Sequence, residues 1–424
     1  MSKKILLTVV LVAVLAVVSI AQETITVAAG AVGIELELAK KAAREFESIF
    51  PGVEVKVLDT PDMATDRLGL YLQFFEAESS KVDVYQIDVI WPGDLAQHFV
   101  DLYKYGGHDY APNHFQPIIE NNTVDGELIA IPWFTDAPVL YYRTDLLEEY
   151  GFDGPPETWD ELENMAEVVT KGEKEDNPDF WGFVFQGNAY EGLTCDALEW
   201  IASNDGGTII NSDKEVTIAN ENAADILEQV RGWIGTIAPE GVLTFDEEAS
   251  RKVWQGGNAL FMRNWPYAYK LSQSDDSAVK GKFDVTTLPR GKGKPSSTLG
   301  GWQLAVSKYS ENPALAAQVA FFFANYKHQK ERAIEASYNP TIKTLYQDPE
   351  VLEAVPFFGT LYDVFVNAVA RPSTASAPNY NEVSTLFFKA VHKIISGESN
   401  DPMGTLEELA LDIAEVTGFE PVFE

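Results

Sequence analysis

Hydrophobic and polar residues in the early part of the chain follow strand and helix patterns in turn. A short apolar run at 24–28 predicts a buried strand, and apolar residues recur at helical spacing over 34–50. The same order repeats with a strand at 53–58, a helix at 62–79 and a strand at 82–90. Strands that alternate with helices predict an α/β fold with a parallel sheet, in which ligands bind at the carboxyl ends of the strands.

The segment 125–143 interrupts this order and predicts a crossing between two lobes. Short apolar strands at 128–131 and 139–142 flank a centre that Pro132 and Pro138 bracket. Proline lacks a backbone donor and restricts the residue before it, so neither strand is expected to continue as the central strand of one sheet.

Two later segments predict further crossings, the apolar strand 298–306 and the pair Asn339-Pro340. A chain of 424 residues is long enough for two lobes. The predicted division is a signal peptide at 1–21, an N-terminal lobe of 22–133 plus 300–335, and a C-terminal lobe of 134–299 plus 336–424.

The first residues have the composition of a secretory signal. Two lysines precede an apolar run at 5–18, and the small-x-small sequence 19–21 forms a cleavage site ahead of Gln22. The run is short for a bilayer span, so we predict cleavage after Ala21, with a retained membrane anchor as the alternative. No cysteine follows the run, which argues against a lipoprotein. The expected location is the periplasm or another extracytoplasmic space.

The net charge argues against binding to nucleic acids or anionic membranes, and the cysteine content argues against a disulfide-stabilised fold. The formal charge is −34, with 65 acidic against 31 basic residues, and such a field repels nucleic acid and anionic membranes. Neutral or cationic ligands suit this charge. Cys195 is the single cysteine, so no internal disulfide is expected and the fold relies on burial of its apolar residues.

Several charged residues fall where a sheet-end crevice is expected. Glu35 follows the exit loop of the first strand, Asp88 lies near the end of the third, and Arg67 lies on the helix between the second and third strands. In the first crossing, Phe134 and Asp136 place an aromatic face near a carboxylate. Aromatic faces stack on sugar rings, and carboxylates accept hydrogen bonds from sugar hydroxyls. The alternatives are solvated surface charges, a turn-forming acid and a buried aromatic side chain.

Later parts of the chain add four aromatic residues that are candidates for the site. Tyr190 ends a loop, 186–190, that contains polar side chains as well as this aromatic one. Trp265 and Tyr267 flank a proline. Gly301 and Trp302 begin the second crossing strand, where glycine permits close backbone approach. Core packing is the alternative for these aromatic residues. Contacts distributed over several crossings suit a clamp that closes on a ligand better than a fixed catalytic pair.

The motifs of several enzyme classes are missing from the sequence. The five histidines lie far apart without paired-ligand spacing, so no metal site is predicted. No nucleophile elbow, phosphate loop or dinucleotide fingerprint occurs, and no cofactor is expected. Glycoside hydrolysis needs only two carboxylates about 5 to 10 Å apart, so a secreted glycoside hydrolase acting on α-glucosides stays the enzymatic alternative. A surface-structure protein is a third class, disfavoured because the sequence has no repeats.

Motifs along nearly the whole mature chain resemble the sugar-binding proteins of ABC importers. The motifs of the general resemblance are PGV at 51–53, DVIW at 88–91, DGELIAIP at 125–132, LYYRTDLL at 140–147, PETWDEL at 156–162, GGNAL at 256–260 and GGW at 300–302. The likeness is greatest to the trehalose/maltose-binding branch. Its motifs are WGFVFQG at 181–187, YEGL at 190–193, CD at 195–196, RNWPYA at 263–268 and ARP at 370–372.

The resemblance implies a two-lobe, type II periplasmic-binding-protein-like fold, in which each lobe is a sheet flanked by helices and three segments cross between the lobes. It implies a monomeric, non-enzymatic protein that binds an α-linked glucosyl disaccharide of the trehalose, maltose or sucrose type and delivers it to the permease of an ABC importer. Catalytic residues, metals and cofactors are not implied.

The resemblance also assigns roles to individual residues at matching positions. It implies that Glu35, Arg67, Asp88, Asp136 and Arg371 hydrogen-bond sugar hydroxyls, and that Trp265, Tyr267 and Trp302 stack on the rings, with the Gly301 backbone close by. Phe134 stands where such relatives can carry tyrosine, and the loop 30–33 is apolar. These departures leave the choice of sugar open.

Overall fold

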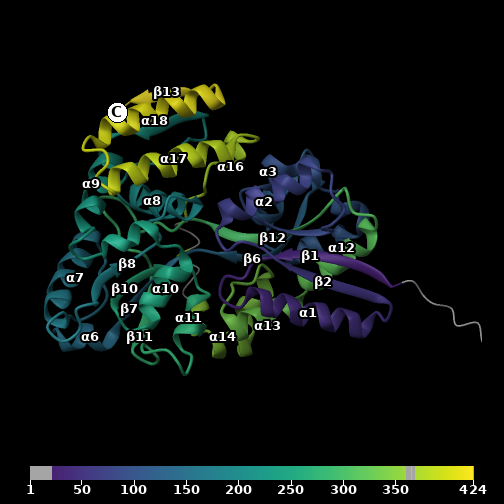
Figure 1. Ribbon diagram of the computed structural model, residues 1–424, viewed down its shortest axis with the longest axis horizontal. Coiled ribbons are helices and arrows are strands. Elements are labelled where there is room, and N and C mark those ends of the chain that lie inside the picture. Colours follow the sequence, from purple (N-terminus) through teal and green to yellow (C-terminus); the bar gives the residue numbers. More distant parts are fainter. Residues whose placement is uncertain (1–21, 360–363, 365–367, 424) are drawn as a thin grey trace, which may run out of the picture.

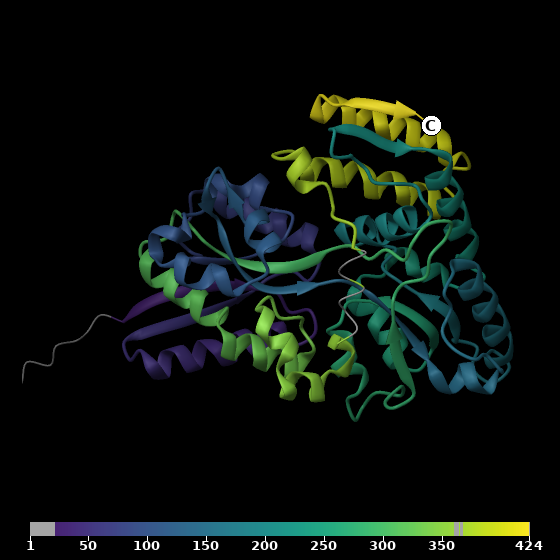
Figure 2. The ribbon, with the colours of Figure 1, turned by 180° about the vertical axis from the view of Figure 1, so that it is seen from behind.

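Two α/β lobes lie side by side, and the chain passes between them more than once (Figures 1 and 2). This computed structural model describes residues 22–359, 364 and 368–423. The predicted signal peptide at 1–21 lies outside the described residues, so its cleavage stays a prediction. Within the described ranges, no helix has both the length and the apolar character needed to cross a bilayer.

The centre of the N-terminal lobe is a five-stranded sheet. Its strands are β1 (Glu23–Ala29), β2 (Val53–Asp59), β3 (Val84–Asp88), β6 (Ala130–Asp136) and β12 (Gly300–Val306). They lie in the order β2-β1-β3-β12-β6. β1 is parallel to β2 and β3, as predicted, but β12 runs antiparallel to β3 and β6. The predicted parallel arrangement is confirmed for β1, β2 and β3, and the crossing strand β12 runs antiparallel because it returns from the other lobe and enters from the opposite end.

Helices cover both faces of this sheet. The larger ones are α1 (Glu35–Ile49), α2 (Ala64–Glu76), α12 (Pro313–Phe323) and α13 (Tyr326–Ala336). Apolar residues of α1 pack with Val27, whereas those of α2 pack with the next residue, Ala28. Successive strand residues point to opposite faces, so α1 and α2 lie on opposite sides of the sheet. The predicted helices at 34–50 and 62–79 are confirmed with slightly shorter bounds.

Short elements complete the N-terminal lobe. They are α3 (Pro92–Leu95), η1 (Ala96–His98), η2 (Leu102–Tyr105), α4 (Gly107–Tyr110), η3 (Ala111–Asn113), α5 (Gln116–Asn121), β4 (Thr123–Val124) and β5 (Glu127–Leu128).

The C-terminal lobe has a four-stranded sheet of its own. Its strands are β7 (Val139–Arg143), β8 (Trp181–Val184), β10 (Ala259–Asn264) and β11 (Phe283–Thr286), in the order β11-β7-β10-β8. The helices are α6 (Thr144–Glu149), α7 (Trp159–Glu173), α8 (Glu191–Ser203), α9 (Glu221–Trp233), η4 (Glu240–Thr244), α10 (Glu247–Gln255) and α11 (Ala268–Ser272). α7 starts with the predicted capping box, in which Thr158 and Glu161 satisfy each other's backbone donors.

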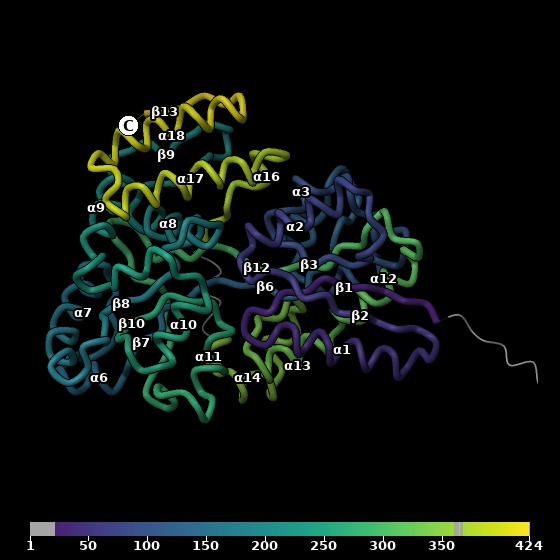
Figure 3. The backbone as a smooth tube through the Cα atoms, viewed as in Figure 1, coloured from purple at the N-terminus to yellow at the C-terminus, as the bar shows by residue number. Residues whose placement is uncertain are grey.

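The last part of the chain adds a further layer to this lobe (Figure 3). α17 (Tyr380–Ile395) packs on α8 and α9, and α18 (Pro402–Thr417) packs on α17. β9 (Glu215–Ala219) pairs in parallel with β13 (Glu420–Phe423). The remaining elements are η5 (Lys343–Gln347), α14 (Pro349–Ala354), η6 (Pro356–Gly359) and α16 (Ser373–Ser376).

The first crossing joins the two sheets directly, because β6 leads through Ala137 and Pro138 into β7. β6 includes Pro132, so the predicted strand end at that proline is wrong. β6 is the edge strand, and its ladder to β12 shifts between Trp302 and Gln303, so the missing backbone donor is tolerated there. The predicted lobe boundaries stay predictions; β6 keeps its pairing with β12 as far as Asp136.

Candidate functional site

Strand ends of the N-terminal lobe face the other lobe across a cleft that residues of both lobes line. Glu35 begins α1, Asp88 ends β3 and Asp136 ends β6. β12 runs in the opposite direction, so its first residues lie at the same sheet edge: Trp302 pairs with Asp88, and Gly300 with Asp136.

Arg371 connects carboxylates from both walls of the cleft. Its Nη2 donates to Asp88 Oδ1 at 3.0 Å, and its Nη1 donates to Glu191 Oε1 at 2.8 Å. Glu191, the first residue of α8, also accepts hydrogen bonds from the hydroxyls of Tyr380 and Ser384. Burial raises the pKa of Glu191, and the positive charge of Arg371 opposes this rise. Charge-assisted hydrogen bonds thus hold this end of the cleft in a defined geometry.

Glu35 and Asp136 are buried carboxylates that both line the cleft. The Gln86 side chain accepts a hydrogen bond from Gly30 N at 2.7 Å and donates to Glu35 Oε2 at 3.1 Å, which orients that carboxylate. Asp136 Oδ1 has no hydrogen-bond partner among the described residues. Burial raises the pKa of Glu35, and burial together with the charge of Glu35 raises the pKa of Asp136 well above its usual range. An acceptor without a partner therefore faces the cleft.

Aromatic side chains form the opposite wall. Trp265 Nε1 lies 3.4 Å from Glu247 Oε1, and the Tyr190 hydroxyl donates to Glu247 Oε2 at 2.7 Å. The Trp265 ring lies against Gly300, where a Cβ atom would be 2.8 Å from Cζ3 of the ring. A side chain at position 300 would displace the indole, so glycine allows the two walls to approach. The Tyr267 hydroxyl donates to Glu248 Oε1 at 2.9 Å.

Residues 33–330 match the family of bacterial extracellular solute-binding proteins. The chain belongs to this family. A relative from Deinococcus radiodurans, "Probable ABC transporter-binding protein", is 50% identical over 93% of this chain and 94% of its own length. The solved structure "Maltose bound T. maritima MalE3" superposes with a TM-score of 0.88 at 39% identity, over 93% of this chain and 99% of that one.

More distant solved structures confirm the fold of this solute-binding protein. A ribitol-bound solute-binding protein from Agrobacterium radiobacter K84 superposes with a TM-score of 0.82 at 22% identity, over 94% of this chain and 99% of that one. The predicted type II, two-lobe fold and the resemblance to sugar-binding proteins of ABC importers are confirmed. Because the family consists of binding proteins, the glycoside hydrolase alternative is set aside.

Nearly all residues predicted for the site of this solute-binding protein converge on the cleft. The residues that line it are Glu35, Asp88, Phe134, Asp136, Tyr190, Trp265, Tyr267, Gly301, Trp302 and Arg371. Arg67 is fully buried behind the lining, and its guanidinium carbon lies 4.2 Å from the centre of the Trp302 ring. Its Nη1 and Nη2 atoms have no hydrogen-bond partner among the described residues.

Sequence reasoning missed four polar lining residues, Asp62, Glu191, Glu247 and Tyr338. Glu191 directly follows the predicted Tyr190, and its place at the start of a helix was a usable signal. Glu247 follows Asp246, whose side chain caps α10 by accepting from Ala249 N. No local pattern distinguishes Glu247 from the many surface acids, because only the tertiary fold brings it to the cleft.

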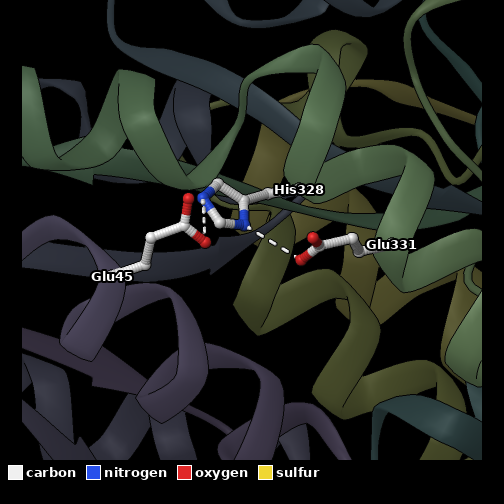
Figure 4. Close-up of side chains that lie close together, drawn as sticks. All are labelled: Glu45, His328 and Glu331. Carbon is white, nitrogen blue, oxygen red and sulfur yellow. Dashed lines mark ion pairs between the residues drawn. The ribbon is translucent and has the colours of Figure 1, made fainter.

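A separate cluster in this solute-binding protein joins α1 and α13 (Figure 4). The buried His328 has Nδ1 at 3.5 Å from Glu331 Oε2 and Nε2 at 4.0 Å from Glu45 Oε2. Burial lowers the pKa of His328, and both carboxylates already pair with lysines: Glu45 with Lys327, and Glu331 with Lys41 at 3.4 Å. We interpret it as an ion-pair cluster that fastens two helices.

Proposed function

We propose that this protein is the sugar-binding component of an ABC importer, which captures an α-linked glucosyl disaccharide of the trehalose, maltose or sucrose type and delivers it to the permease. The observation that carries the proposal is the composition of the cleft, where buried carboxylates and aromatic rings from both lobes converge. Carboxylates accept from sugar hydroxyls and aromatic faces pack on sugar C–H groups, so this lining suits a neutral sugar.

Individual roles follow from the chemistry of each side chain. Among the lining residues, we assign hydroxyl contacts to Glu35, Asp88, Asp136 and Arg371, ring stacking to Trp265, Tyr267 and Trp302, and wall contacts to Phe134, Tyr190 and the Gly301 backbone. Arg67 lies behind the lining, so in place of the predicted hydroxyl contact we propose that it supports the Trp302 ring from behind. Charged hydrogen bonds contribute about 1.5 to 3 kcal/mol each, so this set supports micromolar or tighter binding.

The relatives favour a sugar with α-linked glucose units. The solved structure at 39% identity holds maltose. A maltotriose-binding protein of Pyrococcus abyssi is 22% identical over 77% of this chain, and a galactooligosaccharide-binding protein of Bacillus subtilis is 24% identical over 69%. The higher identity to the maltose-bound protein is why we propose an α-glucoside.

Contacts between the lobes support a mechanism of closure. The Glu191 backbone donates to Thr65 Oγ1 at 3.2 Å, and the Asn381 backbone donates to Asp94 Oδ2 at 3.1 Å. A sugar that contacts both walls binds the closed form better than an open one and shifts the population toward it. We propose that the permease recognises this closed form, and that the protein acts as an extracytoplasmic monomer after cleavage following Ala21.

Titration calorimetry of residues 22–424 against trehalose, maltose, sucrose and glucose tests the proposal, with product analysis of each mixture. Saturable one-to-one binding of a disaccharide without new products supports it and identifies the sugar. Maltotriose and a galactooligosaccharide extend the panel to longer and to β-linked or galactose-containing ligands. Cleavage of any sugar contradicts a binding role, and heat signals with the galactooligosaccharide alone contradict the α-glucoside.

A further inference from the structure

Arg332 lies on α13, behind the cleft, and contacts its wall without lining it. Its side chain is buried, at 4% exposure. The guanidinium carbon lies 4.0 Å from the ring centre of Trp133 and 4.7 Å from those of both Phe134 and Tyr338. Phe134 and Tyr338 line the cleft, and their ring centres are 4.9 Å apart. Arg332 therefore contacts two cleft aromatics from behind.

The charge of Arg332 is not paired with a carboxylate in the usual way. Its Nε and Nη2 atoms have no hydrogen-bond partner, and no ion pair to Arg332 is found in the parts of the chain described. Buried charges are normally paired, because desolvation without a partner is costly. Three aromatic faces around a guanidinium offset part of that cost through cation–π attraction. The positive charge of Arg332 is therefore not neutralised by an ion pair among the described residues.

Glu35 and Asp136 are the cleft carboxylates on which Arg332 acts. Burial raises the pKa of both, and the positive charge of Arg332 opposes the rise in each case. Around Glu35 the other charged groups are Arg67, which also opposes the rise, and Asp62, which adds to it.

Asp136 is surrounded differently. The neighbouring charges of Glu35 and Asp88 raise its pKa further, whereas Arg332 and, less strongly, Arg263 oppose that rise. Arg263 lies 4.5 Å from the centre of the Trp265 ring but is paired with Glu199. Arg332 contacts the Phe134 and Tyr338 rings without an ion pair among the described residues, so this side chain links the position of two cleft rings to the charge of both acids.

We propose that Arg332 is a positioning residue of the sugar site: it holds the Phe134 and Tyr338 rings in place, and its buried positive charge favours the ionised form of Glu35 and Asp136. The inference rests on the proposed sugar-binding function. It also deepens it, because a charge that favours the ionised form of these two acids favours ligand groups that donate, such as hydroxyls, over groups that only accept.

Two substitutions separate the charge from the planar stack. Arg332→Met replaces the side chain with an unbranched apolar one and so removes the charge. Arg332→Lys keeps the charge and removes the planar group that stacks on the rings. Arg44→Met is the matched control, because Arg44 is an exposed arginine of α1 and its loss changes the net charge equally. Circular dichroism and thermal unfolding establish that each variant folds, and Arg332→Gln is the neutral substitute if the methionine variant does not.

The first readout is maltose affinity by calorimetry across about pH 5 to 8. Arg332→Met is expected to bind on the order of tenfold more weakly near pH 7, with a deficit that widens as the pH falls. Arg332→Lys is expected to bind more weakly at all pH values with the pH profile of the wild type. Wild-type affinity and pH profile in Arg332→Met, or the same deficit at every pH in both variants, overturns the proposal.

The second readout does not depend on any sugar. Carbon-13 NMR titration of the unliganded protein follows the Asp136 carboxyl, assigned by comparison with Asp136→Asn. Its pKa is expected to rise further in Arg332→Met and to stay near the wild-type value in Arg332→Lys and Arg44→Met. An unchanged pKa in Arg332→Met overturns the charge role. If wild type binds no sugar but the titration shifts as expected, the proposed function fails while the action of Arg332 on the carboxylates stands.

Discussion

The guanidinium of Arg371 lies 3.0 Å from the Asp88 carboxylate. Asp88 ends β3 in one lobe, and the same guanidinium contacts Glu191 at the start of α8 in the other. One arginine therefore joins the two walls of the cleft, at the place where we propose that a sugar contacts both. The arrangement makes Asp88 and Arg371 parts of the closed form as well as proposed ligand contacts.

Asp88→Ala is expected to weaken binding of the preferred disaccharide roughly tenfold or more, about the loss of one charged hydrogen bond. The measurement is titration calorimetry, with thermal unfolding to verify the fold. Asp153→Ala is the control, because Asp153 is an exposed acid that does not line the cleft. Wild-type affinity in Asp88→Ala would remove this residue from the proposed site.

Trp265→Ala is expected to lower sugar affinity by a similar factor, because the proposed stacking face is lost. Gly300→Ala is expected to weaken binding without removing the indole, since its Cβ atom would lie 2.8 Å from the ring and displace it. Gly154→Ala is a matched control, as a Cβ atom there meets nothing within 4 Å. Equal affinities in the two glycine variants would show that the position of the indole does not matter.

Sugar affinity is expected to rise with pH above the ordinary range of aspartate. The folded-state pKa of Asp136 is raised above its usual 3.8, so the group keeps its proton to a higher pH than in the unfolded chain. Hydroxyl donors bind the ionised form better, so binding releases a proton and tightens as the pH rises through that raised pKa. Calorimetry in buffers of different ionisation enthalpy measures the released proton, and Asp136→Asn is expected to reduce it.

The same shift has a consequence for stability without ligand. A carboxyl with a raised folded pKa binds more protons in the native state than in the unfolded state, so its contribution falls as the pH rises from about 3.8 toward the raised value. The unliganded Asp136→Asn variant is therefore expected to lose less stability than the wild type over that interval, measured by thermal unfolding. A steeper loss in the variant contradicts the raised pKa.

Arg263→Met is expected to destabilise the fold by about 3–5 kcal/mol, the usual cost of removing one partner from a buried ion pair. Arg263 is almost fully buried and pairs with Glu199 and with Asp196, both buried, so the substitution leaves two uncompensated carboxylates. Urea unfolding measures the loss. Lys280→Met removes an exposed pair with Asp275 and is expected to change stability little. Similar midpoints for both variants would contradict the structural role of Arg263.

Much of the local structure could be predicted because its causes lie close together in the sequence. The helix that begins after Thr158 has its cap and its matching acid within one turn, and the structure contains both hydrogen bonds. Pro132 misled the prediction for the opposite reason. Whether a strand tolerates a proline depends on whether it lies at a sheet edge, and that is decided by β12, far along the chain.

The sequence by itself determined the alternation of strands and helices, the acids at the strand ends and the resemblance to sugar-binding proteins, since these depend on periodicity and on short motifs. Only the tertiary structure decided which acids meet. Arg371 reaches Asp88 and Glu191, and Arg332 lies behind Phe134, because the crossings bring together residues from distant parts of the chain. Burial, which shifts the pKa of the cleft acids, arises only when the two lobes enclose them.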